Sequence, residues 1–281
     1  MLERWLAHPA TRDLDLDDPR TTLLRKDILR EKHFLQRIYR EWYEALVAEL
    51  PVPTGRVLEV GSGAGFLAEY VPGLITSDVI PLSGIRYALD ATALPIADAV
   101  LDAVIGTNVL HHLASPRRFL LEAARCLRPR GVLVLIEPWV TSWSRFVYSH
   151  YAHEPFEPEA VEWELSPTGP LAGANGALPW ILWCRDRQRF EREFPTWEIR
   201  LVQPIMPVRY LLSGGIALRV SMPGWSFPFW TRCESWLSRW HQHTGMFAKI
   251  VLQRRSSGPR PAADHRRNEA RGLDANGSKP S

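Results

Sequence analysis

Residues 57–66 read "VLEVGSGAGF", and this stretch decides the fold. A short apolar run containing Glu59 opens directly into a loop with Gly61, Gly63 and Gly65. Glycine permits positive φ and lets a ligand approach the backbone without a Cβ in the way. A helix that follows such a loop offers unpaired N–H groups. The pattern predicts a strand, a nucleotide-binding turn and a helix, although several cofactors use turns of this type.

Two competing loop types can be tested on the residues. A phosphate loop of the GxxxxGK[ST] kind is absent, because no Lys-Ser or Lys-Thr pair follows the glycines. The dinucleotide fingerprint GxGxxG requires glycine at position 66, where this chain has Phe66. Glu59 would repel a pyrophosphate but suits a cationic cofactor, such as a sulfonium with a free amine. The loop therefore favours a cationic nucleotide cofactor over NAD.

Working outward, short apolar runs alternate with helical segments. Continuous apolar runs suit strands buried on both faces, as in a parallel sheet. The runs cover 56–60, 73–78, 85–90, 101–106 and 131–137, and we expect helices at 64–71, 108–114, 116–127, 141–151 and 186–194. Two late strands at 196–204 and 246–254 would finish the sheet as an antiparallel pair. The rhythm predicts an α/β fold with a doubly wound, mostly parallel sheet.

The remaining segments suggest a domain plan. We expect a loose leader over 1–21, a single domain over 22–253 and a disordered polar tail over 254–281. Within the domain, amphipathic helices span 22–50, a cofactor core spans 55–138, and a helical and aromatic insert or lid comprises 139–185 and 205–245. The insert carries a run of acids without basic partners, Glu154, Glu157, Glu159, Glu162 and Glu164.

Composition excludes several classes of function. The formal charge is +3, but residues 254–281 hold seven of the 34 basic and three of the 31 acidic residues. The rest of the chain is thus close to neutral, which gives no support to nucleic-acid binding. Three separated cysteines show no metal-binding spacing, so we expect buried thiols, no metal and a cytoplasmic location. No signal peptide or membrane span is visible.

Two acids follow the next apolar runs. Asp78 closes the second run, 17 residues after Gly61, where a carboxylate can accept hydrogen bonds from both hydroxyls of a ribose. The alternative is an acid that caps a turn before Pro81. Asp90 closes the third run, where it would either bind an exocyclic amine or form a turn.

Five ordered motifs resemble those of class I S-adenosylmethionine-dependent methyltransferases: "VLEVGSGAGF", "SDV", "DATALP", "DAVIGTNVLHHL" and "LRPRGVLVLIEP". The match is strong over 55–138 and is similar to the small-molecule branch that includes ubiquinone and menaquinone biosynthesis methyltransferases. The resemblance implies a seven-stranded Rossmann-like sheet with a reversed last strand, and S-adenosylmethionine as cofactor. It also implies these roles: Glu59, Gly61, Ser62, Gly63 and Gly65 around the methionine moiety; Asp78 on the ribose; Val79 against the adenine; Asp90 with Ala91 at the adenine edge; and Asn108 lining the cofactor.

Methyl transfer is an in-line displacement, for which an enzyme chiefly supplies proximity and alignment. A base is needed only if the acceptor must lose a proton. His111 and His112 follow the fourth run and Glu137 ends the fifth, so these three are the candidate bases; the alternative is that a histidine packs or caps. The Asn/Asp-Pro-Pro-aromatic motif of enzymes that methylate amino groups of nucleobases or glutamine is absent after the fourth run.

Acceptor specificity should lie outside the shared motifs, in 22–50, 139–185 and 205–245, which hold most of the 12 tryptophans. We expect a small-molecule acceptor of lipid, quinone-like or glycosidic type. The segment 223–240, "PGWSFPFWTRCESWLSRW", is a candidate for peripheral membrane contact, or else an aromatic core or dimer interface. Two other classes stay open at this point: a non-catalytic S-adenosylmethionine-binding subunit, and an NAD-dependent oxidoreductase or epimerase.

Overall fold

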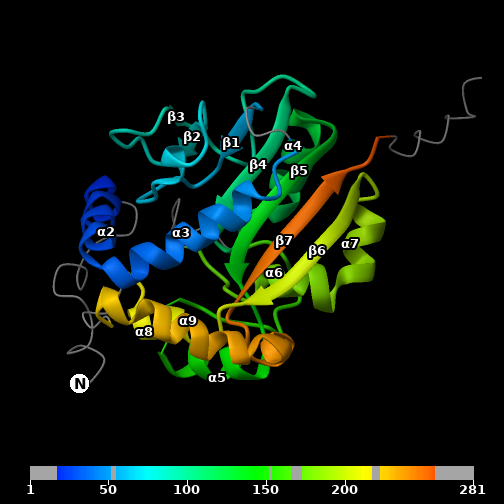
Figure 1. The fold of residues 1–281 in the computed structure, drawn as a ribbon. Helices are drawn as coiled ribbons and strands as arrows, with labels where there is room; N and C mark the ends of the chain where they lie inside the picture. Colours follow the sequence, from blue (N-terminus) through cyan, green and yellow to red (C-terminus); the bar gives the residue numbers. More distant parts are fainter. Residues whose placement is uncertain (1–17, 52–54, 152–153, 166–172, 217–221, 257–281) are drawn as a thin grey trace, which may run out of the picture.

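A seven-stranded sheet forms the centre of the computed structural model, which describes residues 18–51, 55–151, 154–165, 173–216 and 222–256 (Figure 1). The strand order is β3-β2-β1-β4-β5-β7-β6. All neighbours from β3 to β5 are parallel, whereas β7 is antiparallel to both β5 and β6. The strands are β1 (Val57–Glu59), β2 (Ile75–Asp78), β3 (Tyr87–Ala88), β4 (Leu101–Thr107), β5 (Leu127–Pro138), β6 (Trp197–Ile205) and β7 (Phe247–Arg254). The doubly wound fold with a reversed last strand is confirmed.

Both faces of the sheet are buried along its central strands β1, β4, β5 and β7, and this explains their continuous apolar runs. Val57 and Ile105 point into one core with the N-terminal helices, whereas Leu58 and Val104 point into a second core on the opposite face. Figure 1 shows α3 (His33–Val47) crossing the first face. Helices α4 (Pro116–Cys126) and α7 (Arg187–Glu193) contribute to the second core.

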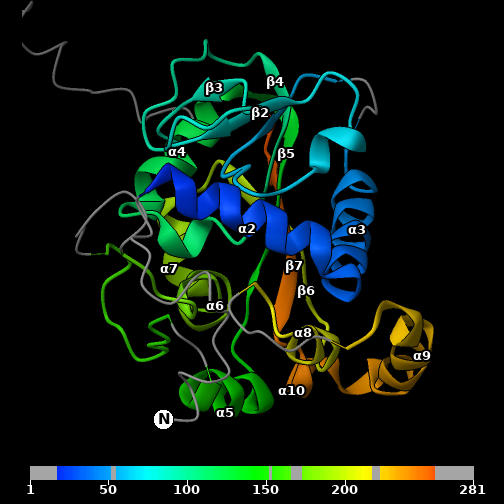
Figure 2. The same ribbon diagram turned by 90° about the vertical axis from the view of Figure 1, so that its left-hand side faces the viewer.

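Further helices gather beyond the carboxyl ends of β4 and β5. Figures 1 and 2 place α5, α8, α9 and α10 together at this end of the sheet. The helices not yet given are α2 (Pro19–Glu31), α5 (Ser142–Tyr151), α6 (Leu178–Trp180), α8 (Arg209–Ser213), α9 (Phe227–Trp236) and α10 (His241–Thr244). There are also 3-10 turns η2 (Leu67–Glu69), η3 (Leu110–His112), η5 (Gly224–Ser226) and η6 (Ser238–Trp240), and a π-helical segment η4 (Ile181–Arg185). Among the described residues, no helix has both the length and the apolar character to cross a bilayer.

Three expected helix boundaries are wrong. The helix expected over 64–71 is the single turn η2, because Gly61 and Gly63 hold left-handed backbone and Pro72-Gly73 ends the segment soon afterwards. The helix expected over 108–114 is likewise only η3. Helix α2 begins at Pro19, inside the expected leader, where the Asp18 side chain accepts a hydrogen bond from the Arg20 N–H and caps the helix. Residues 1–17 and the tail from 257 lie outside the described residues.

Candidate active site

The glycine loop after β1 is shaped by its neighbours. Gly61 has φ +65°, and a Cβ there would lie 2.6 Å from Val109 Cγ2. Glycine is thus required because the loop touches the segment that follows β4. Gly63 has φ +41°, and its Cβ would meet nothing closer than 3.7 Å. Gly65 lies under α3, since its Cβ would come within 2.6 Å of the Tyr43 hydroxyl, and that hydroxyl accepts the Phe66 N–H at 3.2 Å.

Glu59 lies beneath this loop rather than on its surface. Only 3% of the residue is exposed, and its Oε2 accepts a hydrogen bond from Ser62 Oγ at 2.7 Å. Ser62 Oγ in turn accepts the Ser77 N–H at 3.1 Å and so ties the loop to β2. Burial raises the pKa of Glu59 to about 7, with a contribution from the nearby Asp78 carboxylate. Two carboxyl groups thus lie close together beside the loop, which suits a positively charged ligand.

Asp78, at the end of β2, faces the same loop. Its Oδ2 accepts the Gly63 N–H at 2.9 Å and its Oδ1 accepts the Ile80 N–H at 3.0 Å. Each carboxylate oxygen can accept more than one hydrogen bond, so these contacts leave capacity for two ribose hydroxyls. The next side chain, Val79, is 41% exposed although it is apolar. An exposed apolar surface beside a buried acid fits an adenosine with its base on Val79.

Asp90 and Ala91 lie next to Asp78, because the Leu89 N–H donates to the Asp78 carbonyl at 2.8 Å. Asp90 Oδ1 accepts both the N–H and the hydroxyl of Thr92 at 2.8 Å, so the carboxylate forms the turn that the sequence offered as one alternative. Ala91 is buried. Contact of this loop with an adenine edge remains a prediction.

After β4 the chain turns sharply at Asn108, which has φ +53°. Its N–H donates to the Ile136 carbonyl on β5 at 2.9 Å. The next two N–H groups, of Val109 and Leu110, both donate to Glu137 Oε1, at 2.9 and 2.8 Å. The buried carboxylate of Glu137 therefore fixes the path of the segment that carries the histidines.

Glu137 also orients His111, because its Oε2 lies 2.6 Å from His111 Nδ1. Glu137 is wholly buried and both of its oxygens are engaged, so the expectation that it takes a proton from the acceptor is not supported by its geometry. It is a positioning residue for His111. The Nε2 atom of His111 points the other way, toward Glu154 Oε2 at 3.4 Å.

His112 and Glu154 complete a cluster with His111. His112 Nε2 lies 3.9 Å from the same Glu154 oxygen, and the two imidazole rings are 4.1 Å apart. Side-chain exposure rises from 2% for His111 to 20% for His112 and 45% for Glu154, so the cluster opens on the Glu154 side. One nitrogen or oxygen atom from each of these three residues lies within 4.8 Å of the others. The sequence predicts no metal here, and that expectation stays a prediction.

The charges in this cluster differ between neighbours. Burial would lower the pKa of His111, but the Glu137 and Glu154 carboxylates outweigh it and raise the pKa to about 9. Burial and the adjacent His111 lower the pKa of His112 to about 4. Burial would raise the pKa of Glu154, but the two histidines and Arg25 lower it to about 2. At neutral pH the cluster therefore holds a protonated His111, a neutral His112 and an ionised Glu154.

The sequence did not single out Glu154 for the site. It is one of five acids in the insert for which the sequence offers no basic partner nearby, and only its position just after α5 brings it to His111. Tyr210 was also missed: it stacks on Trp42 with ring centroids 5.7 Å apart and lies 4.6 Å from the Phe247 ring. Burial, with the Tyr39 hydroxyl and the Glu154 carboxylate nearby, raises the pKa of Tyr210.

Comparison with known proteins finds similarity to methyltransferases. A protein family described as "Methyltransferase domain" matches residues 58–135. An uncharacterized methyltransferase of Mycobacterium sp. (strain JLS) is 34% identical over 145 residues, which cover 41% of this chain and 58% of that protein. A demethylmenaquinone methyltransferase of Renibacterium salmoninarum is 30% identical over 157 residues, 50% of this chain and 61% of that protein. The chain thus spans about three fifths of the length of these relatives.

A solved geranyl diphosphate C-methyltransferase from Streptomyces coelicolor A3(2) aligns over 89% of this chain and 91% of its own, with 12% identity and a TM-score of 0.47. The family match covers the glycine loop, Asp78, Asn108 and the histidines, which are the residues that the fold brings to one edge of the sheet. Residues 58–135 therefore match a methyltransferase domain, the kind of domain that the motifs of the sequence resemble.

Proposed function

We propose that this protein transfers the methyl group of S-adenosylmethionine to a small-molecule acceptor that binds between the glycine loop and the insert. The observation that carries the proposal is the contact between the loop and the histidine segment, where Gly61 packs against Val109. A cofactor held by the loop and by Asp78 would lie next to His111. Donor and acceptor sites would then share the carboxyl edge of the parallel strands, which is where ligands bind in sheets of this kind.

The cofactor, when bound, supplies a sulfonium methyl group. A nucleophile attacks the methyl carbon in line, and the thioether is the leaving group. The chain contributes binding and alignment: Asp78 holds the ribose, and the carboxyl groups of Glu59 and Asp78 favour the positive charge of the donor. Correct alignment of two reactants contributes as much as ~7–11 kcal/mol in favourable cases. Glu137 keeps His111 Nε2 directed at the acceptor side, while His112 is the neutral imidazole at this edge.

We propose a ring-bearing, largely apolar acceptor. We propose that four aromatic side chains form the walls of its site: Tyr39, Tyr148 and Tyr210, which lie near the Glu154 carboxylate, and Trp42, which stacks on Tyr210. The Tyr39 and Trp42 rings are 5.2 Å apart, and Tyr148 Oη donates to the Met246 carbonyl at 2.8 Å. Flat aromatic walls favour a quinone-like ring or a sugar ring through stacking contacts. The similarity to a demethylmenaquinone methyltransferase supports the first of these.

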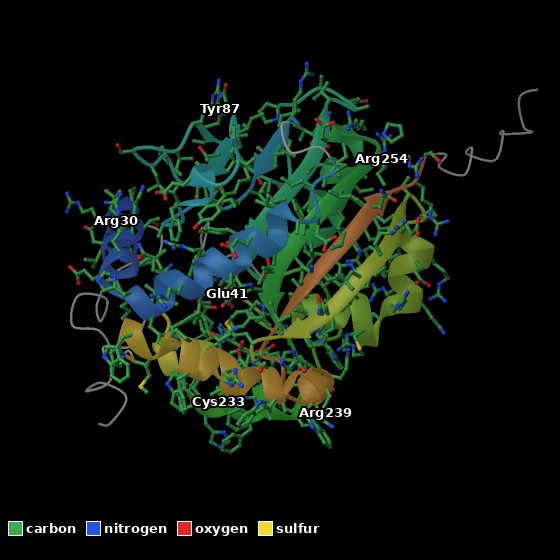
Figure 3. All side chains as sticks on the ribbon, viewed as in Figure 1. Arg30, Glu41, Tyr87, Cys233, Arg239 and Arg254 are labelled. Atoms are coloured by element: carbon green, nitrogen blue, oxygen red, sulfur yellow. The ribbon has the colours of Figure 1, made fainter. Side chains whose placement is uncertain are left out.

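An exposed aromatic surface suggests that the acceptor is reached at a membrane. Trp225 is 82%, Phe229 62%, Trp236 71% and Trp240 55% exposed, and these positions recur at helical spacing along η5, α9 and η6. Figure 3 labels Arg239 and Cys233 on the same outer edge. Glu234, the single acid between 222 and 245, is buried against Arg209. Tryptophan with arginine, free of exposed acids, suits an anionic bilayer surface.

Sedimentation with vesicles tests the membrane contact. The full chain should sediment with phosphatidylglycerol vesicles, and replacing Trp236 and Trp240 by serine should reduce the bound fraction at least fivefold. Leu121→Ser is the matched control, because Leu121 is 56% exposed on α4, away from this surface. A dimer that dissociates in the double variant, with no vesicle binding by the wild type, would assign the surface to self-association instead.

Two measurements test the catalytic proposal. Calorimetric titration should show binding of S-adenosylmethionine and no binding of NAD. Incubation of membrane and soluble extracts with the protein and methyl-labelled cofactor should then yield a labelled product that gains ~14 Da. Binding without any labelled product would indicate a non-catalytic S-adenosylmethionine-binding subunit, and binding of NAD alone would overturn the assignment.

A further inference from the structure

Three donor atoms converge beside the cofactor loop in a way that methyl transfer does not require. They are Nε2 of His111, Nε2 of His112 and Oε2 of Glu154, with Glu154 3.4 Å from the first and 3.9 Å from the second. The residues come from two parts of the chain: η3 after β4, and the segment after α5. We propose that this cluster binds a divalent transition-metal ion, with Zn²⁺ as the probe ion.

The distances are close to those of a bound ion. Zn²⁺ lies about 2.0–2.2 Å from imidazole nitrogen and carboxylate oxygen, so two ligands of a tetrahedral site are separated by roughly 3.4 Å. The His111–Glu154 distance matches this value, and the His112–Glu154 distance exceeds it by about half an ångström. Glu154, 45% exposed and outside any helix or strand, is the ligand with room to make that movement.

The support behind His111 is that of a metal ligand. Metal-binding histidines usually donate their second ring N–H to a carboxylate, which fixes the tautomer and the ring orientation. Glu137 provides this contact at 2.6 Å, and it is itself held by the N–H groups of Val109 and Leu110. Nε2 of His111 is therefore aimed at the ion position before any ion arrives.

The ligand set indicates the class of ion. Two imidazoles and one carboxylate suit zinc, iron, cobalt or manganese better than magnesium, which prefers oxygen ligands and retains its water. Three protein ligands leave at least one coordination position open, as in catalytic rather than structural zinc sites. The open coordination position would lie on the solvent-exposed side of the cluster, near Glu154, because the buried His111 and Glu137 close the opposite side.

The role of the ion rests on the proposed function, although the binding site does not. An acceptor hydroxyl at the open position would lose its proton to solvent more readily, because the ion stabilises the oxyanion. The oxyanion would then form the new C–O bond as the C–S bond of the donor breaks, which leaves neutral S-adenosylhomocysteine. The rival arrangement has no ion, with a protonated His111 bridging Glu137 and Glu154.

The experiment is a titration of the chelator-treated full chain with ZnCl₂, followed by calorimetry, and with CoCl₂, followed by visible absorption. We expect one Zn²⁺ per chain with micromolar or tighter affinity, and a Co²⁺ spectrum of low coordination number. Glu154→Gln and His112→Asn should each weaken binding at least 10-fold. Glu159→Gln should stay within about twofold of the wild type, because Glu159 is 80% exposed and contacts Arg145 instead.

Two outcomes would overturn the site: no Zn²⁺ binding by the wild type, or equal Zn²⁺ affinity in the wild type and both ligand variants. Circular dichroism on the same samples identifies a variant that fails to fold, and the other ligand variant then decides. Titration of the same samples with S-adenosylmethionine separates this result from the proposed function. If the wild type binds S-adenosylmethionine but no Zn²⁺, the proposed metal site is wrong and the proposed methyl transfer is unaffected.

Discussion

Replacing Gly61 by alanine tests whether the loop and the histidine segment are in contact. The new methyl carbon would lie 2.6 Å from Val109 Cγ2, so one of the two must move. A left-handed backbone costs a non-glycine residue about 1–2 kcal/mol. Overpacking a buried contact adds about 1–3 kcal/mol. The free energy of unfolding should therefore fall by roughly 2–5 kcal/mol.

Gly73→Ala provides the matched control. Gly73 has φ +76°, and its Cβ would meet nothing within 4 Å, so the variant carries the backbone strain without the clash. Both variants lose the same entropy of glycine in the unfolded chain, and this term cancels in their difference. Urea unfolding followed by circular dichroism should then show Gly61→Ala to be about 1–3 kcal/mol less stable than Gly73→Ala.

Cofactor affinity provides a second readout for the same pair. Displacement of Val109 shifts the backbone that lines the site, so Gly61→Ala should bind S-adenosylmethionine at least 10-fold more weakly, and Gly73→Ala should bind it normally. If both variants had equal stability, within about 0.5 kcal/mol, and equal affinity, the packing of the loop on the segment after β4 would be refuted.

Three further predictions concern the charges of the site. Asp78→Asn should lower S-adenosylmethionine affinity at least 10-fold in calorimetry, whereas Asp90→Asn should change it less than threefold, because Asp90 already forms a turn; the reverse ranking would exchange their roles. Glu59→Gln should raise the free energy of unfolding of the free protein at pH 8, because a buried acid with a pKa of about 7 is charged there, and should weaken cofactor binding; a less stable variant would contradict this. The raised pKa of His111 contributes stability that is complete below about pH 6.5 and is lost as pH rises toward 9. With a chelator present, the difference in free energy of unfolding between the wild type and Glu154→Gln should shrink as pH rises toward 9, because His111 then loses its charge. A constant difference would show that Glu154 does not raise the pKa of His111.

Much of the fold could be predicted because the central strands are buried on both faces. Continuous apolar runs located six of the seven strands to within a few residues, and the two late runs correctly indicated the antiparallel pair. β5 is the exception: it begins at Leu127 rather than 131, because its first residue pairs with Leu101 before a register shift that follows the left-handed Arg130. The helix expected after the glycine loop is only one turn because Gly61 and Gly63 hold left-handed backbone and Pro72-Gly73 follows soon afterwards.

The site residues that could be predicted lie at strand ends, whereas those that could not depend on contacts between distant parts of the chain. Loop residues such as Gly61 and Asp78 follow directly from strand ends, and strand ends of a parallel sheet meet at one edge. The role of Glu137 required the structure, since a terminal strand acid gives no sign that both its oxygens will be engaged. Glu154 lies 17 residues beyond Glu137 in the insert, and no periodicity in the sequence links it to His111.

The position of β7 has a consequence for how the chain assembles. β7 follows all the other described strands along the chain, yet it lies between β5 and β6, so β6 has no partner in this sheet until residue 247 onward has emerged. Until then β5 and β6 both present unpaired edges, and exposed edges of apolar strands favour association with other chains. A chain that ends before β7 would therefore keep the cofactor loop, the histidines and Glu137 in sequence, but would leave the sheet that positions them open on the β5 side.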